Sequence, residues 1–162
     1  MKIGVLSDTH IHLAEEIPAE VVRAFSNVDL IVHAGDFVGS EVLEGLKQLG
    51  EVKAVHGNVD SMKLRSLLPE KEIFIAGTKK IGITHGWGSP EGIENRVKEM
   101  LGDVDIIIYG HSHRAKIEQI GKVLFFNPGP GWQSFGILTI EEGVKGEIIK
   151  LKMSPWVIAK GL

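Results

Sequence analysis

The stretch KIGVLSDTH, residues 2–10, determines the fold class. Residues 3–6 form a short continuous apolar run, which is typical of a strand buried on both faces. A similar run occurs at residues 30–32, residues 52–55 (VKAV) indicate a third strand, and amphipathic segments fill the intervals between them. A strand–helix–strand–helix–strand order indicates parallel strands joined by right-handed crossovers. The first third of the chain therefore predicts an α/β fold.

Two helices are expected between these three strands. The first extends from about Pro18 to Ser26. The second begins at Ser40, a good N-cap residue, with Glu41 near the positive end of the helix dipole. Gly50 is a typical residue to end that helix.

After Pro69 the pattern changes to hairpins and shorter strands. Residues 72–76 and 80–84 flank the turn Gly77-Thr78 and predict a β-hairpin. Ser89-Pro90-Glu91 predicts the start of a helix that ends at Gly102. One more buried strand is expected at residues 105–109, and antiparallel strands at 115–120, 122–126, 135–140 and 145–151. Together these patterns predict one α/β domain over residues 1–162, with mixed sheets and helices outside.

The composition restricts the possible functions. The chain has 162 residues, 43% of them hydrophobic and 24% charged, which is typical of a globular protein. Its net charge of -3 offers no general basic surface for nucleic acid or anionic lipid. It contains no cysteine, which excludes disulfides, thiolate nucleophiles and cysteine-type zinc sites. Without a signal peptide or an apolar run near 20 residues, we expect a cytoplasmic protein with no membrane contact.

Five short polar patterns each follow an apolar strand, in a turn that contains glycine, serine or threonine. Ligands bind at the carboxyl ends of strands in open α/β sheets, so these patterns are expected to meet in one crevice. Glycines beside them allow tight turns and close approach. The patterns are Asp8-Thr9-His10, Gly35-Asp36, Gly57-Asn58-Val59-Asp60, His85-Gly86 and Gly110-His111-Ser112-His113.

The residue types in these patterns indicate metal chemistry. Two carboxylates, four imidazoles and one carboxamide suit Mn, Fe, Zn, Ni or Co, whereas Ca or Mg favours more oxygen ligands. Seven ligands are too many for one ion with an open position, but they serve two ions when one carboxylate bridges. Two dications with only Asp8 and Asp36 leave excess positive charge, which favours an anionic substrate such as a phosphate ester.

Each pattern alone also has an ordinary structural interpretation. Gly-Asp is common in turns, and Asn58-Val59-Asp60 could be turn chemistry as well. Only the shared order and position of the five patterns favour a metal site. Among the other histidines, His33 lies within a strand and is interpreted as structural, while His12 and His56 stay open.

The five patterns, in this order, resemble those of the calcineurin-like metallophosphoesterase family, and the match covers nearly the whole chain. The chain looks most similar to the small, cap-less phosphodiesterases of bacteria and archaea. The resemblance implies a four-layer α/β/β/α sandwich of two mixed β-sheets flanked by helices. It also implies two divalent metal ions per chain, with Mn expected first and Ni, Co, Fe or Zn as alternatives. The implied reaction is phosphodiester hydrolysis by in-line attack of a metal-bridging hydroxide.

The same resemblance assigns roles to individual positions. Asp60 is implied to orient a ligand, and Asn127-Pro128-Gly129-Pro130 resembles the family loop that borders the site. Asp36, which bridges the ions, and Asn58 are the implied catalytic residues among the ligands. One ion is assigned to Asp8, His10, Asp36 and His113, and the other to Asp36, Asn58, His85 and His111.

One position departs from the family pattern. Many relatives have histidine in the motif Gly-Asn-His-Asp, where this chain has Val59. That histidine helps stabilise the transition state or protonates the leaving oxygen, and valine can do neither. We therefore hypothesise that His12 supplies a proton, with His56 as the second choice.

Several alternatives stay open. Within enzymes, a phosphomonoesterase is the second choice; a nuclease is disfavoured by the acidic net charge and by the lack of room for a DNA-gripping domain. The fold also resembles the small retromer subunit, a scaffold that has lost several ligand positions. The apolar tail, residues 153–162, either docks on its own domain or contacts a second subunit in a homo-oligomer. Four basic residues could line the mouth of the site or be ordinary surface charges: Lys63, Arg65, Arg96 and Arg114.

Overall fold

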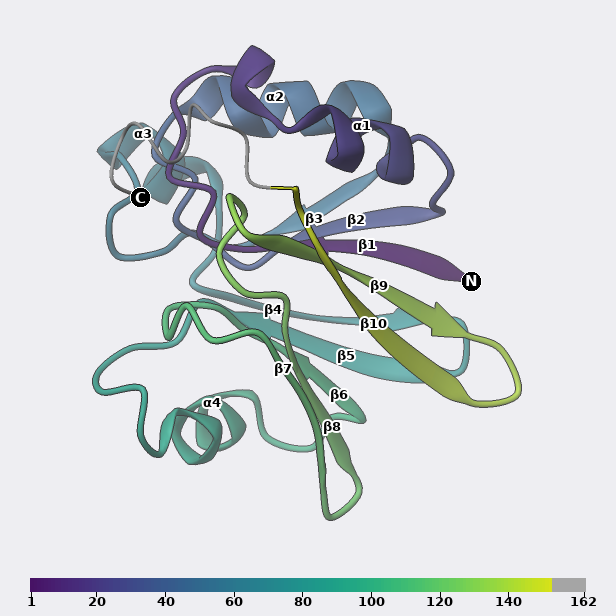
Figure 1. Ribbon diagram of the computed structural model, residues 1–162. Helices are drawn as coiled ribbons and strands as arrows, with labels where there is room; N and C mark the ends of the chain where they lie inside the picture. The colour runs from purple at the N-terminus through teal and green to yellow at the C-terminus, as the bar shows by residue number, and fades with distance from the viewer. Residues whose placement is uncertain (153–162) are drawn as a thin grey trace.

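A computed structural model describes residues 1–152 of the chain. Two five-stranded β-sheets stack face to face, and helices cover their outer faces (Figure 1). The expected four-layer α/β/β/α sandwich is therefore confirmed. The tail of residues 153–162, for which docking and subunit contact were both expected, lies outside the described residues.

The first sheet has the strand order β10-β9-β1-β2-β3. Its three N-terminal strands run parallel, as the sequence predicts, while β9 pairs antiparallel with β1 and β10 antiparallel with β9. The strands are β1 Lys2–Leu6, β2 Leu30–His33, β3 Val52–Ala54, β9 Ser134–Ile140 and β10 Val144–Lys150.

The second sheet has the order β4-β5-β6-β8-β7. The expected hairpin is formed by β4 Lys71–Ala76 and β5 Lys79–Thr84. The expectation of an antiparallel strand at residues 122–126 holds for only one neighbour. β8 (Val123–Asn127) is antiparallel to β7 (Lys116–Ile120) but parallel to β6 (Ile106–Ile108), because the β7–β8 hairpin inserts its second strand beside β6.

The helices lie on opposite sides of the sandwich. Figure 1 shows α1 and α2 over the first sheet and α4 under the second. α1 spans Ala19–Phe25, α2 Ser40–Leu49 and α4 Ile93–Leu101. The sequence did not predict the 3-10 turn η1 (Ala14–Glu16) or α3 (Met62–Leu67), which are too short to display a helical period. No helix in the described part of the chain is long and apolar enough to cross a membrane.

Two predicted helix starts are wrong in detail. Gly39, not Ser40, occupies the N-cap position of α2, and the Ser40 hydroxyl donates to the Glu41 carboxylate at 3.3 Å. α4 begins at Ile93 rather than at Ser89-Pro90-Glu91, because Gly92 has φ of 74°, a left-handed conformation that no helix interior accepts. The expected ends at Gly50 and Gly102 are confirmed.

The core explains why the first strand is continuously apolar. Ile3 and Val5 point into the layer between the two sheets, whereas Leu6 points into the layer under α1 and α2. A Cβ added at Gly4 would come within 2.7 Å of the Phe25 ring, so this glycine lets α1 pack directly on the strand. Burial on both faces fixes the register of β1 and thus the position of the loop that follows it.

Candidate metal centre

The five polar patterns converge at one end of the sandwich. Three of them follow β1, β2 and β3 of the first sheet, and two follow β5 and β6 of the second. Side chains from the two sheets come together there: His85 Nε2, after β5, lies 3.8 Å from Asp8 Oδ1, after β1. The site therefore lies across the junction of the two sheets, at the carboxyl ends of their parallel strands.

Asp8 and Asp36 form the middle of the cluster. Asp8 Oδ1 is 3.1 Å from His113 Nε2 and 3.9 Å from His10 Nε2. Asp36 Oδ2 is 3.1 Å from His85 Nε2 and 3.6 Å from His10 Nε2. Asp36 thus contacts one histidine assigned to each ion, which is the arrangement that a bridging carboxylate needs.

Three buried atoms in this cluster have no hydrogen-bond partner among the described residues: Asp8 Oδ1, His10 Nε2 and His85 Nε2. A buried polar atom left unpaired costs about 1–3 kcal/mol. Here all three atoms face one another, and two groups of ligand atoms lie within 4.8 Å: Asp8, His10 and His113, and Asp8, Asp36 and His85. Such a set of acceptors fits divalent metal ions, which would satisfy all of them at once.

Hydrogen bonds on the far side of two rings fix which nitrogen faces the site. His85 Nδ1 lies 2.7 Å from the Ala34 carbonyl oxygen, and His111 Nε2 lies 2.9 Å from that of Gly88. Metal-binding histidines usually donate their second N–H to such an oxygen. With Nε2 as the donor, the His111 Nδ1 lone pair lies 3.2 Å from Asn58 Oδ1, and a divalent ion would use both atoms as ligands.

The carboxylates and imidazoles of the cluster shift the pKa values of one another. Burial alone raises the pKa of Asp8, but His10 and His113 outweigh it and hold that pKa well below its usual range. Burial also raises the pKa of Asp36, and the combined opposing effects of His85 and the Val59 backbone N–H leave that pKa lowered. Burial lowers the pKa of His85, yet the two carboxylates leave it raised, and Asp8 raises the pKa of His113. The carboxylates are therefore ionised at neutral pH, and a metal ion competes with protons on the histidines.

The backbone at the site is strained. Non-glycine residues with positive φ are uncommon, and they cluster at functional sites where the surrounding structure holds them. Six occur among the described residues; apart from Val38 with φ of 81°, all are predicted ligands. These five are Asp8 (51°), His10 (49°), Asp36 (60°), His111 (64°) and His113 (54°).

Two glycines of the motifs lie so close to neighbouring side chains that a larger residue would not fit. A Cβ at Gly57 would overlap the Asp36 carboxylate. A Cβ at Gly110 would overlap the Ser7 hydroxyl and lie 2.6 Å from Asp8 Oδ2. These glycines allow the loops after β3 and β6 to approach the ligands that precede them in the chain.

Asp60 and Asn127 hold these loops in place. Asp60 accepts backbone hydrogen bonds from Asp36 at 3.0 Å, Val38 at 2.8 Å and Gly57 at 2.7 Å. It therefore orients a predicted ligand, as expected, although through the backbone rather than the ligand side chain. Asn127 Nδ2 donates to the Gly110 carbonyl at 3.0 Å, which places the buried Asn127 loop directly under the His111–His113 turn.

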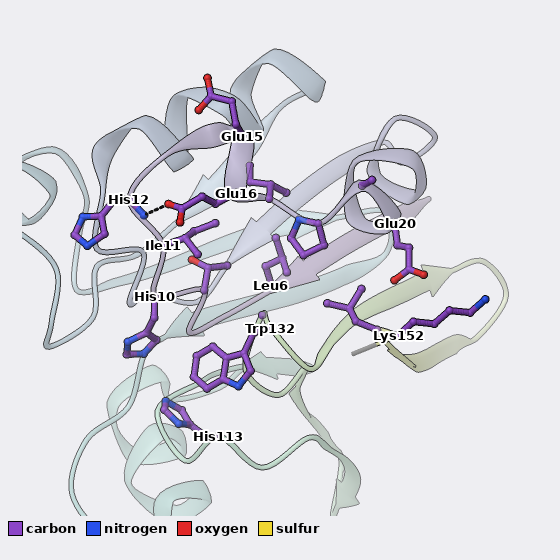
Figure 2. A pocket seen from close by; sticks show the side chains of 16 residues that line it. Leu6, His10, Ile11, His12, Glu15, Glu16, Glu20, His113, Trp132 and Lys152 are labelled. Carbon is purple, nitrogen blue, oxygen red and sulfur yellow. Dashed lines mark hydrogen bonds between the residues drawn. The ribbon is translucent and has the colours of Figure 1, made fainter. Parts of the chain in front are cut away.

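The remaining histidines belong to neither of the two groups of ligand atoms. His12 is exposed, and Figure 2 shows it away from His10 and His113; its backbone N–H donates to Glu16 Oε2 at 2.9 Å. His56 Nδ1 lies 3.4 Å from the Gly57 carbonyl oxygen. His33 is fully buried, contacts Thr9 Oγ1 at 3.1 Å, and burial lowers its pKa to about 3, so it is a neutral structural residue.

The four basic residues near the mouth are engaged in local contacts. Arg65 Nε donates to the Asp60 carbonyl at 3.0 Å and Arg96 Nε to that of Trp87 at 3.0 Å, so both brace site loops. Arg114 pairs with Glu91 at 3.2 Å, and Lys63 Nζ donates to Ser40 Oγ at 3.0 Å. These contacts favour structural roles over substrate contacts.

Sequence reasoning missed Trp132. Its ring makes edge-to-face contacts with His10 and His113, with centroids 5.3 Å apart in both cases. Figure 2 shows the indole beside these two imidazoles. Its position two residues after the predicted Asn-Pro-Gly-Pro loop was the only signal in the sequence.

Comparisons with known proteins agree with this geometry. The chain is 38% identical over 163 residues to the probable metallophosphoesterase MJ0623 of Methanocaldococcus jannaschii, covering 94% of this chain and 82% of that protein. A solved structure described as a novel archaeal phosphodiesterase has a TM-score of 0.76 and 29% identity, covering 93% of this chain and 100% of that one. Wild-type Vps29 from Entamoeba histolytica complexed with Zn²⁺ has a TM-score of 0.71 and 27% identity, covering 93% and 99% respectively.

The family assignment rests on a sequence match that covers most of the chain. The matched range includes every strand that precedes a predicted ligand. The model of the calcineurin-like phosphoesterase superfamily domain matches residues 1–142. All seven predicted ligands lie within that range, at the strand ends described above. The chain therefore belongs to the calcineurin-like phosphoesterase superfamily.

Proposed function

We propose that this protein is a phosphodiesterase that holds two divalent metal ions and hydrolyses a small phosphodiester. The observation that carries the proposal is the set of three unpaired buried atoms, Asp8 Oδ1, His10 Nε2 and His85 Nε2, which lie together where the loops after β1 and β5 meet. Seven ligands with Asp36 in contact with both halves of the cluster are more than one ion needs. Bound divalent ions supply Lewis acidity and lower the pKa of a coordinated water.

The residues of the chain supply position and charge. Asp8 and Asp36 are the only carboxylates among the predicted ligands, so two dications leave a positive centre that attracts a phosphate ester. His85 and His111 are held by the Ala34 and Gly88 carbonyls, and the backbone of Asp36 is held by Asp60. These supports fix the ligands before a substrate arrives, which is what a preorganised site requires.

A diester suits this centre better than a monoester. Two dications, the two carboxylates and one hydroxide formed from a coordinated water would leave a formal excess of one positive charge, which a diester monoanion would neutralise. The relative described as an archaeal phosphodiesterase supports the same choice. A phosphomonoesterase is the second choice, and the acidic net charge of -3 argues against nucleic acid as the usual substrate.

A scaffold role is the candidate from a different class. Vps29 from Entamoeba histolytica shares the fold and has been crystallised with Zn²⁺, so metal binding alone does not separate the two functions. Val59, 45% exposed where many family members have histidine, favours the scaffold slightly. The complete set of seven ligands favours the enzyme. Mn²⁺ as the metal, a cytoplasmic location and a homo-oligomer stay predictions from the sequence.

Hydrolysis assays test the proposal. The protein is stripped with chelator and re-supplied with Mn²⁺, Ni²⁺, Co²⁺, Zn²⁺ or Mg²⁺, and bis-p-nitrophenyl phosphate is compared with p-nitrophenyl phosphate. We expect diester turnover that needs a metal and is lost in Asp36→Asn. Absence of turnover with every metal, in protein that binds two ions per chain, would favour the scaffold. Faster turnover of the monoester than of the diester would indicate a phosphomonoesterase instead of a phosphodiesterase.

A further inference from the structure

A large apolar groove opens beside the metal centre. Its volume is about 1060 Å³, similar to pockets that bind small molecules. His10 and His113 belong to the ligand cluster and also line the groove. The groove is therefore directly adjacent to the metal centre. Figure 2 shows Trp132 beside these two histidines and Leu6 among the side chains that line the groove.

The lining of the groove is apolar at its floor. Leu6, Ile17 and Leu151 are buried there, and Ile11 and Pro18 continue the apolar surface. The half-buried indole of Trp132 adds a flat aromatic face at the side nearest the histidines. Among these residues none is a predicted metal ligand, and nothing in the metal chemistry requires them to be apolar. Burial of an apolar group against them is favourable by about 25 cal/mol per Å².

The rim of the groove carries an excess of negative charge. Three glutamates line it, Glu15, Glu16 and Glu20, together with Lys152. The Glu16 carboxylate is held in place by the backbone N–H groups of His12 and Leu13, each at 2.9 Å. An acidic rim disfavours a second phosphate on the substrate, because like charges at a binding surface are repulsive.

We propose that this groove binds an uncharged aromatic ester group of the phosphodiester, and that Trp132 determines the specificity for it. The inference rests on the proposed function, since it needs a phosphate held at the metal centre. A phosphate anchored beside His10 and His113 has one ester oxygen next to the groove, and a ring on that oxygen lies against the indole. A polynucleotide, whose neighbouring phosphates would face the acidic rim, fits poorly.

Phosphonate binding, measured by calorimetry, tests this proposal without relying on turnover. The P–C bond of a phosphonate is not hydrolysed. The full chain, loaded with Mn²⁺, is titrated with methylphosphonate, phenylphosphonate and 4-carboxyphenylphosphonate. We expect phenylphosphonate to bind about 10-fold or more tightly than methylphosphonate, since it buries a ring. The para carboxylate should remove most of that gain, and Glu15→Gln with Glu20→Gln should restore part of it.

Variants of Trp132 test whether this residue causes the preference for the phenyl group. In Trp132→Ala, compared at saturating Mn²⁺, the preference for the phenyl group should disappear; Trp132→Phe, which keeps a ring beside His10 and His113, should keep much of the preference. Trp87→Ala is the matched control, because Trp87 is 46% exposed and does not line the groove. In turnover, Trp132→Ala should raise KM for bis-p-nitrophenyl phosphate more than it lowers kcat.

The possible results distinguish a failure of the groove assignment from a failure of the proposed function. Equal affinity for methyl- and phenylphosphonate, or a phenyl preference that survives Trp132→Ala, would overturn the groove assignment and leave the proposed function intact. Failure of methylphosphonate to bind the metal-loaded protein would instead count against the proposed function and against this inference with it. Tighter binding of the carboxylated ligand would contradict the role of the acidic rim.

Discussion

The Asp60 carboxylate accepts the backbone N–H of Asp36 at 3.0 Å, and through this bond it holds the central ligand of the site from behind. Asp36 has φ of 60°, a conformation that a non-glycine residue keeps only when its surroundings impose it. The same Asp60 oxygen accepts the N–H of Gly57 at 2.7 Å, so one side chain joins the loops after β2 and β3. The ligand geometry thus depends on a residue that touches no ligand atom of Asp36.

Asp60→Asn should weaken metal binding although Asp60 is not a ligand. The amide has one acceptor oxygen, so at least one of the three N–H groups would face an NH₂ group. We expect a 10- to 100-fold loss of Mn²⁺ affinity, with about 1–3 kcal/mol less stability against unfolding. Calorimetry and thermal unfolding measure these two effects. Asp103→Asn, at an exposed acid remote from the site, should change neither; unchanged affinity in Asp60→Asn would refute the positioning role.

Gly110→Ala should destabilise the site because its Cβ would overlap the Ser7 hydroxyl and crowd Asp8. Overpacking of this kind costs about 1–3 kcal/mol, which thermal unfolding detects as a lower Tm, and the displaced Asp8 should bind metal less tightly. Gly143→Ala is the control, because a Cβ there meets no atom within 4 Å among the described residues. Equal Tm values for the two variants would show that the close approach at Gly110 does not exist.

Metal affinity should fall as the pH falls. The pKa values of His85 and His113 are raised above 6.5 in the metal-free protein, so both rings begin to take up protons above that pH, and a metal ion must displace them. Asp8 and Asp36 have lowered pKa values and stay ionised throughout the range from pH 8 to pH 5. We expect the Mn²⁺ Kd to rise from pH 8 to pH 6, by up to about tenfold per pH unit for each displaced proton. A Kd that is constant over this range would contradict the histidine assignment.

His12 can be tested as a proton donor by the choice of leaving group. If His12 protonates the leaving oxygen, His12→Ala should slow the hydrolysis of diphenyl phosphate by about 10²-fold or more, whereas bis-p-nitrophenyl phosphate, whose leaving group needs no proton, should react at an almost unchanged rate. His56→Ala serves as the comparison. Equal effects of His12→Ala on both substrates would remove His12 from the mechanism.

The sequence predicted the parallel strands and the grouping of the polar motifs because both depend on local patterns, whereas the four layers were implied only by the family resemblance. The continuous apolar runs before Asp8 and Asp36 specify buried parallel strands, and such strands bring the residues after them to one edge. The structure adds what no local pattern contains: Asp60 is a ligand-orienting residue through backbone contacts 24 positions away, and Trp132 reaches His10 from the far end of the chain.

The errors have local physical causes. Ser40 looks like an N-cap residue, but Gly39, in an extended conformation, occupies that position instead. Ser89-Pro90-Glu91 has the composition of a helix start, yet the left-handed Gly92 delays α4 to Ile93. The neighbours of β8 depend on sheet assembly, which the hairpin sequence around it does not encode.

The central claim is that two ions act together at the cluster around Asp8 and Asp36. Metal-free protein at a concentration far above Kd is titrated with Mn²⁺, and the initial rate of bis-p-nitrophenyl phosphate hydrolysis is recorded against metal equivalents per chain. We predict a rate that stays low below one equivalent, rises steeply to two and is constant beyond two. A rate that reaches its maximum at one equivalent, or hydrolysis by the metal-free protein, would contradict the dinuclear site.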